Sequence, residues 1–208
     1  MTRRALTLRD YFLGNASPVI RALIVGDVTY YAGVGLFGPI FALFIAQLVD
    51  GNSAEVVGVA IAIYLITKSL VQIPAAWIID KICGEKDDFW FMFGGLFAAA
   101  LIQMLYLFIK TPFDLYLVQF LLGIALAFNF PSFMALFTKH IANNREATMW
   151  GVYYTFFDLV SAAAAAIGGV IATMFGFKAI ILVGTIIGVI GALMLLPMRK
   201  HIRGAQNC

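Results

Sequence analysis

The sequence has little charge for its length. Only 12% of its 208 residues are Asp, Glu, Lys or Arg, while 62% are hydrophobic. Soluble domains hold about 25% charged and about 45–50% apolar residues. So few charged side chains cannot cover a water-facing surface, which excludes an ordinary soluble domain. We therefore expect an integral, multi-pass protein of the cell membrane, surrounded by the lipid bilayer.

Cysteine and histidine are also scarce, with two of each. Cys83 and Cys208 fall on the side of the membrane that is expected to be reducing, so no disulfide is predicted. His140 and His201 lie in polar segments, and neither a Gly-x-Ser-x-Gly nor a His-Glu-x-x-His motif occurs. We expect no enzyme activity, no metal site and no cofactor. The net charge of +3 reflects the membrane topology and predicts no nucleic-acid partner.

Long apolar runs are what the chain has in abundance. Each run reaches the ~20 residues that cross a ~30 Å hydrocarbon layer as a helix. The six runs cover residues 22–48, 55–79, 89–109, 113–137, 147–175 and 177–198. The alternation of period two that marks a membrane barrel is absent. The predicted fold class is all-α integral membrane, a single domain of residues 1–208 with six transmembrane helices.

The basic residues of the loops predict the orientation. With an even number of crossings, both termini lie on one side of the membrane. That side holds eleven basic residues, Arg3, Arg4, Arg9, Arg21, Lys81, Lys86, Lys139, Arg145, Arg199, Lys200 and Arg203. The other side holds only Lys110 and Lys178. Because short cytoplasmic loops are rich in Lys and Arg, both termini are expected to be cytoplasmic.

The two halves of the chain resemble each other at an offset of 92–93 residues. The segment GLFGPIFALF around Pro39 is matched by AFNFPSFMALF around Pro131. The expected repeat units are about residues 18–110 and 111–200. Three crossings per unit make the second unit inverted relative to the first, and inverted repeats are typical of secondary transporters. Chance similarity among hydrophobic helices is the alternative.

One lysine lies deep in an apolar run. Lys68 is near the middle of the second expected helix, where a lysine costs about 2.5–3.5 kcal/mol on insertion scales. Asp158 lies at a similar depth in the fifth helix, and Asp27 is nearer the cytoplasmic third of the first. Tyr64 and Gln72 flank Lys68 at a spacing of four residues and share its stripe on the helix.

Polar side chains are concentrated in the first, second, fourth and fifth expected helices, whereas the third and sixth are expected to face lipid. We predict a cavity for substrate or coupling ions, lined by Asp27, Tyr31, Tyr64, Lys68, Gln72, Gln119, Asn129, Tyr154 and Asp158. The alternative is a structural ion pair that joins the second helix to the fifth.

Prolines and small residues predict bending and close packing of the helices. A proline inside a helix removes a hydrogen bond and allows a kink, and small residues let two helices approach closely. The candidate positions are Gly35, Pro39, Gly123, Pro131, Gly168 and Gly169. Ordinary small-residue packing is the alternative for each of them.

The segment AWIIDKICGEK resembles the loop motif between the second and third helices of the major facilitator superfamily. That motif contains Gly-x-x-x-Asp-Arg/Lys-x-Gly; Asp80 and Lys81 match it, and Gly84 comes one residue late. The resemblance covers essentially residues 18–200 and corresponds to one six-helix half. It implies that Asp80, Lys81, Gly84 and Arg145 form a cytoplasmic gate.

A second motif bears on coupling. Proton-coupled members of the family carry Arg-x-x-x-Gly on the fourth helix, where this chain reads QFLLGIA. Gly123 matches the glycine, and Gln119 stands in place of the arginine. Any coupling to protons would then have to use Asp27, Lys68 or Asp158.

The resemblance implies a transporter of a small-molecule substrate by alternating access. Family members usually have two halves in one chain, and this chain resembles one of them. We therefore expect a parallel homodimer with a two-fold axis along the membrane normal. The alternatives are a non-transporting membrane subunit or scaffold, or a truncated half that pairs with another membrane protein.

Overall fold

The computed structural model describes residues 13–14, 16–48, 53–82 and 84–202. Within these ranges every regular element is a helix, and no strand is present. The elements are α2 (Pro18–Phe37), η1 (Gly38–Ile40), α3 (Phe41–Leu48), α4 (Ser53–Lys81), α5 (Glu85–Gln103), η2 (Met104–Phe108), α6 (Pro112–His140), α7 (Glu146–Leu193) and η3 (Leu196–Lys200). Cys83 and Cys208 lie outside the described residues.

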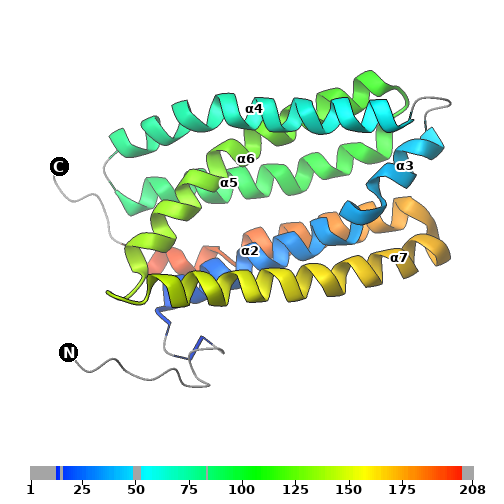
Figure 1. The fold of residues 1–208 in the computed structure, drawn as a ribbon. Coiled ribbons are helices and arrows are strands. Elements are labelled where there is room, and N and C mark those ends of the chain that lie inside the picture. The colour runs from blue at the N-terminus through cyan, green and yellow to red at the C-terminus, as the bar shows by residue number, and fades with distance from the viewer. Residues whose placement is uncertain (1–12, 15, 49–52, 83, 203–208) are drawn as a thin grey trace.

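Five helices are long and apolar enough to cross a membrane, and the last of them reverses direction. Gly176 interrupts α7 with φ 77° and ψ 175°, a backbone conformation that glycine adopts most readily. Residues 146–175 form the first limb of α7 and residues 177–193 its second limb. Figure 1 shows the two limbs running antiparallel, in yellow and orange. The all-helical membrane fold is thus confirmed, and α7 supplies the fifth and sixth expected helices.

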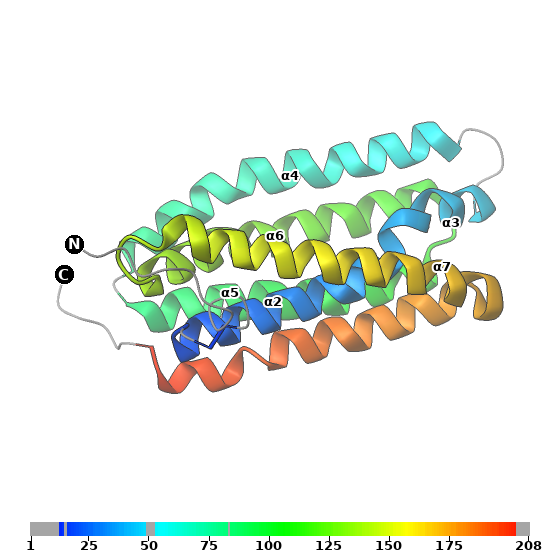
Figure 2. The same cartoon turned by 60° about the horizontal axis from the view of Figure 1, so that its bottom comes forward.

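Both ends of the helical chain meet at one end of the bundle. The start of α2 and the segment η3 lie there together, as Figures 1 and 2 show. We call this the terminal end. The described chain makes six passes along the bundle, in alternating directions. As a result α5 and the first limb of α7 also begin at the terminal end, and α4 and α6 end there.

Capping residues explain where two of the helices begin. The Ser17 hydroxyl accepts a hydrogen bond from the Ile20 backbone N–H at 3.2 Å, and Pro18 follows at the first helical position. At α6, Thr111 and Asp114 form a reciprocal capping box, in which the Asp114 carboxylate accepts from the Thr111 backbone N–H at 2.9 Å. These signals precede the apolar runs and define the helix starts.

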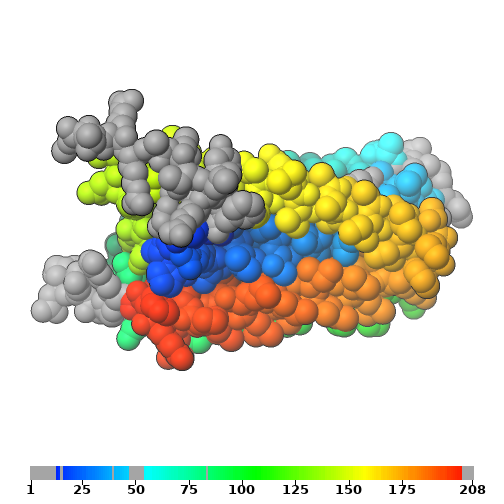
Figure 3. All heavy atoms as spheres, turned by 90° about the horizontal axis from the view of Figure 1, so that it is seen from below, coloured from blue at the N-terminus to red at the C-terminus, as the bar shows by residue number. Residues whose placement is uncertain are grey.

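Small residues set the packing of α2 against α7. Figure 3 shows α2, in blue, in the slot between the two limbs. A Cβ atom on Gly33 would collide with the Gly184 carbonyl of the second limb, and one on Gly168 of the first limb would collide with the Leu36 carbonyl. Close backbone approach of this kind holds membrane helices together, because lipid gives no hydrophobic drive for their association.

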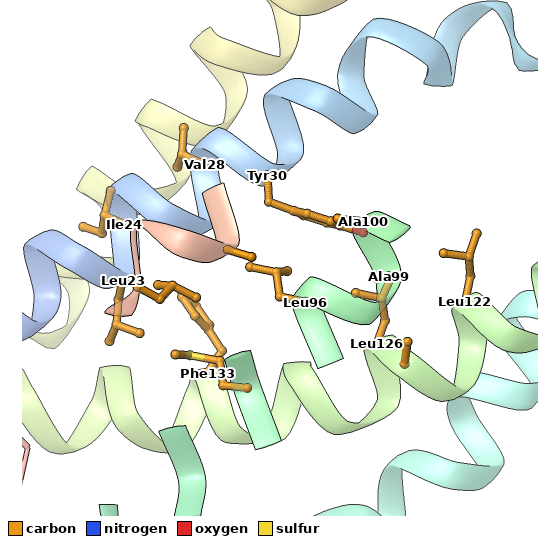
Figure 4. Close-up of a cluster of buried hydrophobic side chains, with 14 of the residues drawn as sticks. Leu23, Ile24, Val28, Tyr30, Leu96, Ala99, Ala100, Leu122, Leu126 and Phe133 are labelled. Atoms are coloured by element: carbon orange, nitrogen blue, oxygen red, sulfur yellow. The ribbon is translucent and has the colours of Figure 1, made fainter. Parts of the chain in front are cut away.

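The core lies where α2 meets α5 and α6. Figure 4 shows apolar side chains from these three helices pointing toward one another. The labelled members are Leu23, Ile24, Val28, Tyr30, Leu96, Ala99, Ala100, Leu122, Leu126 and Phe133, all of them buried. On one side of this core α4 packs on α6, and on the other side α7 packs on α2. The helices α2 and α6 therefore occupy the interior of the bundle.

The two prolines of the expected repeat have different local structures. Pro39 lies in η1, a single 3-10 turn that separates α2 from α3. Pro131 lies inside α6, which remains one continuous helix across it. The 3-10 turn is stabilised by ring contacts, because Phe37 and Phe41 pack on Tyr106 with centroids 5.1 and 5.9 Å apart. The first crossing is therefore broken near the end of the bundle opposite the terminal end.

Candidate cavity and buried polar contacts

A cavity of about 350 Å³ lies between α2, α4, α6 and η2, in the half of the bundle away from the terminal end. Six polar side chains line it: Tyr30, Tyr31, Tyr64, Gln103, Tyr106 and Gln119. The remaining walls are apolar, from Val34, Phe37, Gly38, Phe41, Ile61, Leu122 and Leu126. Three residues of the predicted cavity, Tyr31, Tyr64 and Gln119, are thus brought together here.

A buried hydrogen bond forms the back wall of this cavity. The Gln119 side-chain amide donates to the Tyr106 hydroxyl at 3.1 Å, and both side chains are largely buried. On the opposite wall Tyr30 and Tyr31 meet edge to face, with centroids 5.2 Å apart. Sequence reasoning missed Tyr30 and Tyr106. Tyr106 belongs to η2 and Gln119 to α6, 13 residues later, so spacing along one helix could not reveal their contact, whereas Tyr30 adjoins a residue that was chosen.

Asp27 lies outside this cavity. Its side chain is only 3% exposed, and it accepts a hydrogen bond from the Tyr153 hydroxyl at 2.7 Å. The bond joins α2 to the first limb of α7. One turn farther along α2, the Tyr31 ring packs on Phe157 with a centroid distance of 5.0 Å. Asp27 is therefore a buried carboxylate whose described hydrogen-bond partner is one phenol.

The sequence analysis selected Tyr154 for the cavity, whereas the residue that contacts Asp27 is its neighbour Tyr153. Tyr154 is 53% exposed, whereas Tyr153 is 7% exposed and faces Asp27. Asp158 follows Tyr154 by four residues and is also exposed on the first limb. Consecutive residues of a helix point about 100° apart, so a shift of one residue changes the face completely. Tyr153 could have been found from its spacing of four residues to Phe157.

Lys68 lies on α4, half-buried, with its ammonium over two aromatic rings. The Nζ atom is 4.8 Å from the Phe130 ring centroid and 6.0 Å from that of Tyr64. No ion pair joins Lys68 to Asp158 within the part of the chain that the structure describes. In Figure 1, α6 and α2 lie between α4 and the first limb of α7, so the two charges sit on opposite flanks of the bundle.

A second groove of about 410 Å³ runs between α4 and α6 near the terminal end. Gln72 and Asp80 line it together with Phe130, Pro131 and Met134. Gln72 lies one helical turn from Lys68 along α4, toward the terminal end, and lines this groove rather than the first cavity. This groove does not include the first cavity's tyrosines, so the nine predicted cavity residues do not form one continuous lining.

The predicted gate residues lie at the terminal end but not in one cluster. Lys81 places its ammonium 3.6 Å from the Trp77 ring centroid, and Gly84 precedes the first residue of α5. Arg145 precedes α7 and lines a small cavity of about 260 Å³ with Ser17 and other residues, separate from the groove at Asp80.

Asn129 has a structural contact. Its side-chain amide donates to the Met92 carbonyl at 3.1 Å and so joins α6 to α5. Nearby at the terminal end, Lys139 forms an ion pair of 2.8 Å with Asp88, whose side chain is almost fully buried. His140 lies 3.6 Å from Glu85. These contacts fasten the start of α5 to the end of α6, and sequence reasoning missed both ion pairs.

The small residues chosen from the sequence differ in their surroundings. A Cβ atom on Gly35 would lie 3.0 Å from the Ala164 side chain, and the Cβ of an alanine at Gly123 would lie 2.9 Å from the Tyr64 carbonyl. Gly169 has open space instead. Among the described residues, no group of three or more His, Cys, Asp and Glu side chains could hold a metal ion.

Comparison with known proteins identifies relatives along most of the chain. Residues 23–207 match the family model of the Major Facilitator Superfamily. An uncharacterized MFS-type transporter of Methanocaldococcus jannaschii is 24% identical over 166 residues, which cover 80% of this chain and 42% of the relative. The multidrug resistance protein MdtG of Enterobacter lignolyticus is 26% identical over 196 residues, covering 87% and 43%.

A further relative is the multidrug resistance protein MdtG of Escherichia fergusonii, which is 22% identical over 184 residues. The alignment covers 87% of this chain and 44% of that protein. The chain therefore spans about half the length of the curated relatives it matches.

Proposed function

Because the chain belongs to the major facilitator superfamily, we propose that it is a secondary transporter, which moves a small solute across the membrane by alternating access. The cavity between α2, α4, α6 and η2 carries this proposal. It places hydroxyl and amide groups inside an apolar bundle. Polar groups at such depth are expensive in a membrane and are typical of a solute path.

We propose that the helices form two inverted units, about residues 18–110 and 111–200. Equivalent contacts support this. In the first crossing, a Cβ atom on Gly33 would lie 3.1 Å from the Gly188 backbone nitrogen. At the matching offset of 92–93 residues, a Cβ on Gly95 would lie 2.5 Å from the Ala125 carbonyl. Gly33 is equivalent to Ala125 at an offset of 92, and Gly95 is equivalent to Gly188 at an offset of 93. The contact between Gly33 and Gly188 therefore corresponds to the contact between Ala125 and Gly95.

A second pair of contacts follows the same offset. The Tyr31 ring packs on Phe157, and the equivalent positions are Gly123 and Tyr64. A Cβ on Gly123 would approach the Tyr64 carbonyl at 2.9 Å. The two positions are thus in contact in both units. The contact between α2 and the first limb of α7 joins a tyrosine to an aromatic ring, and the equivalent contact between α6 and α4 joins a glycine to a backbone carbonyl. Exchange of the two units is what lets one cavity open to each side in turn.

We propose that a second six-helix unit completes the transporter, and that it is a second copy of this chain. Lys68 and Asp158 are the supporting residues. They lie on opposite flanks of the bundle, and neither has an ion-pair partner within the described residues. In a parallel dimer with a two-fold axis along the membrane normal, α4 of one copy faces the first limb of α7 of the other. Each Lys68 then approaches the Asp158 of its partner, which offsets the cost of both charges.

Cross-linking tests the dimer. In a chain with Cys83 and Cys208 replaced by Ser, the variants Lys68→Cys and Asp158→Cys are co-expressed and treated with a short bifunctional maleimide. A heterodimeric band is expected. The exposed lipid-facing pair Ile186→Cys and Leu101→Cys is the control and should give no such band. A monomeric particle in mild detergent, with no cross-link, contradicts the homodimer and favours pairing with another membrane protein.

We propose that Asp27 carries the coupled proton if transport is proton-driven. Protonation gives the carboxyl group a donor of its own and so changes its contact with Tyr153, which joins α2 to α7. Asp27→Asn should then abolish stimulation of uptake by a proton gradient, while exchange of labelled for unlabelled solute continues. Gradient-driven uptake that survives in Asp27→Asn contradicts this assignment.

We propose that the terminal end faces the cytoplasm. Ala54 and Asn143 are exposed positions near opposite ends of the bundle. In whole cells, an impermeant maleimide should label Ala54→Cys and should label Asn143→Cys only after the membrane is permeabilised. The reverse pattern would invert the proposed orientation.

Reconstitution tests the transport function. The purified chain is placed in liposomes and offered a panel of organic solutes, chosen because two relatives bear the name multidrug resistance protein. Saturable uptake above protein-free liposomes is expected for at least one solute. If a cross-linked dimer takes up none of them, the chain is better described as a non-transporting membrane subunit.

A further inference from the structure

We infer that the cavity between α2, α4, α6 and η2 selects an uncharged aromatic solute that both stacks and forms hydrogen bonds. This inference rests on the proposed transport function and specifies the chemistry of its site. The cavity volume of about 350 Å³ lies within the range of small-molecule pockets, about 300–1,000 Å³. Size alone does not choose a ligand, so the argument depends on what the walls offer.

The walls offer aromatic surface. Tyr31 of α2 and Tyr64 of α4 line the cavity, and Phe37 and Phe41 line it next to the 3-10 turn of η1. Aromatic side chains present large apolar faces and prefer offset or edge-to-face contact with another ring. A planar aromatic solute can therefore contact more than one wall at the same time.

The back wall offers hydrogen bonds in both directions. Gln119 uses one amide hydrogen to donate to the Tyr106 hydroxyl. By the valence of these groups, its carbonyl oxygen can still accept, and the Tyr106 hydroxyl can still donate. Gln103 adds another amide to the lining. A ligand with a neighbouring carbonyl and N–H group matches this pair.

The cavity offers no formal charge. Its described lining residues include neither a carboxylate nor a cationic side chain. The nearest ones along the helices are Asp27, one turn from Tyr31, and Lys68, one turn from Tyr64. They have opposite signs. Asp27 already accepts a bond from Tyr153, and the Lys68 ammonium lies outside the lining, over the Phe130 and Tyr64 rings at 4.8 and 6.0 Å from their centroids. A charged solute entering the cavity would lose its hydration energy without gaining a counter-charge from the lining. For a cation, contacts with the aromatic rings recover only part of that energy.

Three probes that differ in the charge of one substituent test this selectivity. Naphthamide is uncharged, naphthoate is an anion, and (naphthylmethyl)trimethylammonium is a cation, while the ring system is the same in all three. Binding to the purified full chain is measured by isothermal titration calorimetry in detergent. Naphthamide is expected to bind at least about tenfold more tightly than either charged probe, because a buried unpaired charge is costly.

Variants connect the binding to this cavity. Gln119→Leu and Tyr106→Phe should each weaken naphthamide binding by about three- to tenfold, since each removes a hydrogen-bonding group from the back wall. Tyr106→Phe keeps the ring and the shape, so it remains informative if Gln119→Leu fails to fold. Tyr116→Phe is the matched control, because it removes a hydroxyl from α6 at a residue that does not line the cavity. It should leave the affinity within about twofold.

Two results would overturn the inference. One is binding of naphthoate or of the ammonium probe as tight as that of naphthamide. The other is an unchanged naphthamide affinity in both Gln119→Leu and Tyr106→Phe. Transport is measured separately in liposomes. Selective naphthamide binding without movement of any solute would support the cavity's chemistry and reject the transport function.

Discussion

Replacing Tyr153 by Phe should destabilise the protein through Asp27. The change removes only the hydroxyl that donates to the carboxylate at 2.7 Å. The ring itself is kept, together with its packing on Phe133 and Phe137 at centroid distances of 5.3 and 5.7 Å. The expected loss in the free energy of unfolding therefore reports on a single hydrogen bond.

The size of the loss follows from the setting of this bond. Hydrogen bonds to charged groups contribute about 1.5–3 kcal/mol in soluble proteins. Hydrogen bonds between membrane helices average about 0.6 kcal/mol, with a maximum near 1.7 kcal/mol. Asp27 is only 3% exposed, and no other described hydrogen bond reaches its carboxylate. We therefore expect a loss of about 1.5 kcal/mol, near the upper end of the membrane values.

The measurement is reversible unfolding in mixed micelles at pH 8, and Tyr154→Phe is the matched control. Tyr154 is the next residue, is 53% exposed and makes no described hydrogen bond through its hydroxyl, so its variant should stay within about 0.5 kcal/mol. Equal losses in Tyr153→Phe and Tyr154→Phe would refute the assigned role. A double-mutant cycle with Asp27→Asn isolates the pairwise contribution.

Two further predictions concern packing and charge. Gly168→Ala should lower the free energy of unfolding by about 1–3 kcal/mol because its Cβ would collide with the Leu36 carbonyl, whereas Gly169→Ala meets open space and should be close to neutral in the same unfolding assay. Lys139→Met should lower the unfolding midpoint far more than Lys86→Met, because it leaves the buried Asp88 carboxylate without its ion-pair partner; equal midpoints would contradict this.

Hydropathy predicts the crossings well because lipid leaves the backbone few alternatives. The apolar run at residues 55–79 becomes α4 at Ser53–Lys81, and that at 113–137 becomes α6 at Pro112–His140. The predicted break between 175 and 177 coincides with the reversal of α7 at Gly176. Helix ends differ by a few residues because caps and first-turn polar residues extend each helix beyond its apolar run.

Side-chain partners are less accessible from the sequence. The choice between Tyr153 and Tyr154 depends on how the first limb of α7 is rotated about its own axis. Because this limb is apolar on all of its faces, the sequence pattern does not determine that rotation. The Gln119–Tyr106 bond depends on how α6 packs beside η2. The Asp88–Lys139 pair joins residues 51 positions apart. Depth in the membrane can be counted along a chain, but the direction of a side chain comes from packing.

The position of the intramembrane charges argues for an additional unit beyond this bundle. The interior helices α2 and α6 pair their polar groups locally, as Asp27 does with Tyr153 and Asn129 with Met92. On the flanks, Lys68 contacts the Tyr64 and Phe130 rings among the described residues, and Asp158 is exposed. Charges facing hydrocarbon would be selected against at the known insertion costs. The flanks that carry them are therefore the surfaces where a polar partner would lower the cost most, and the proposed second six-helix unit in parallel orientation would bring the opposite charge to both at once.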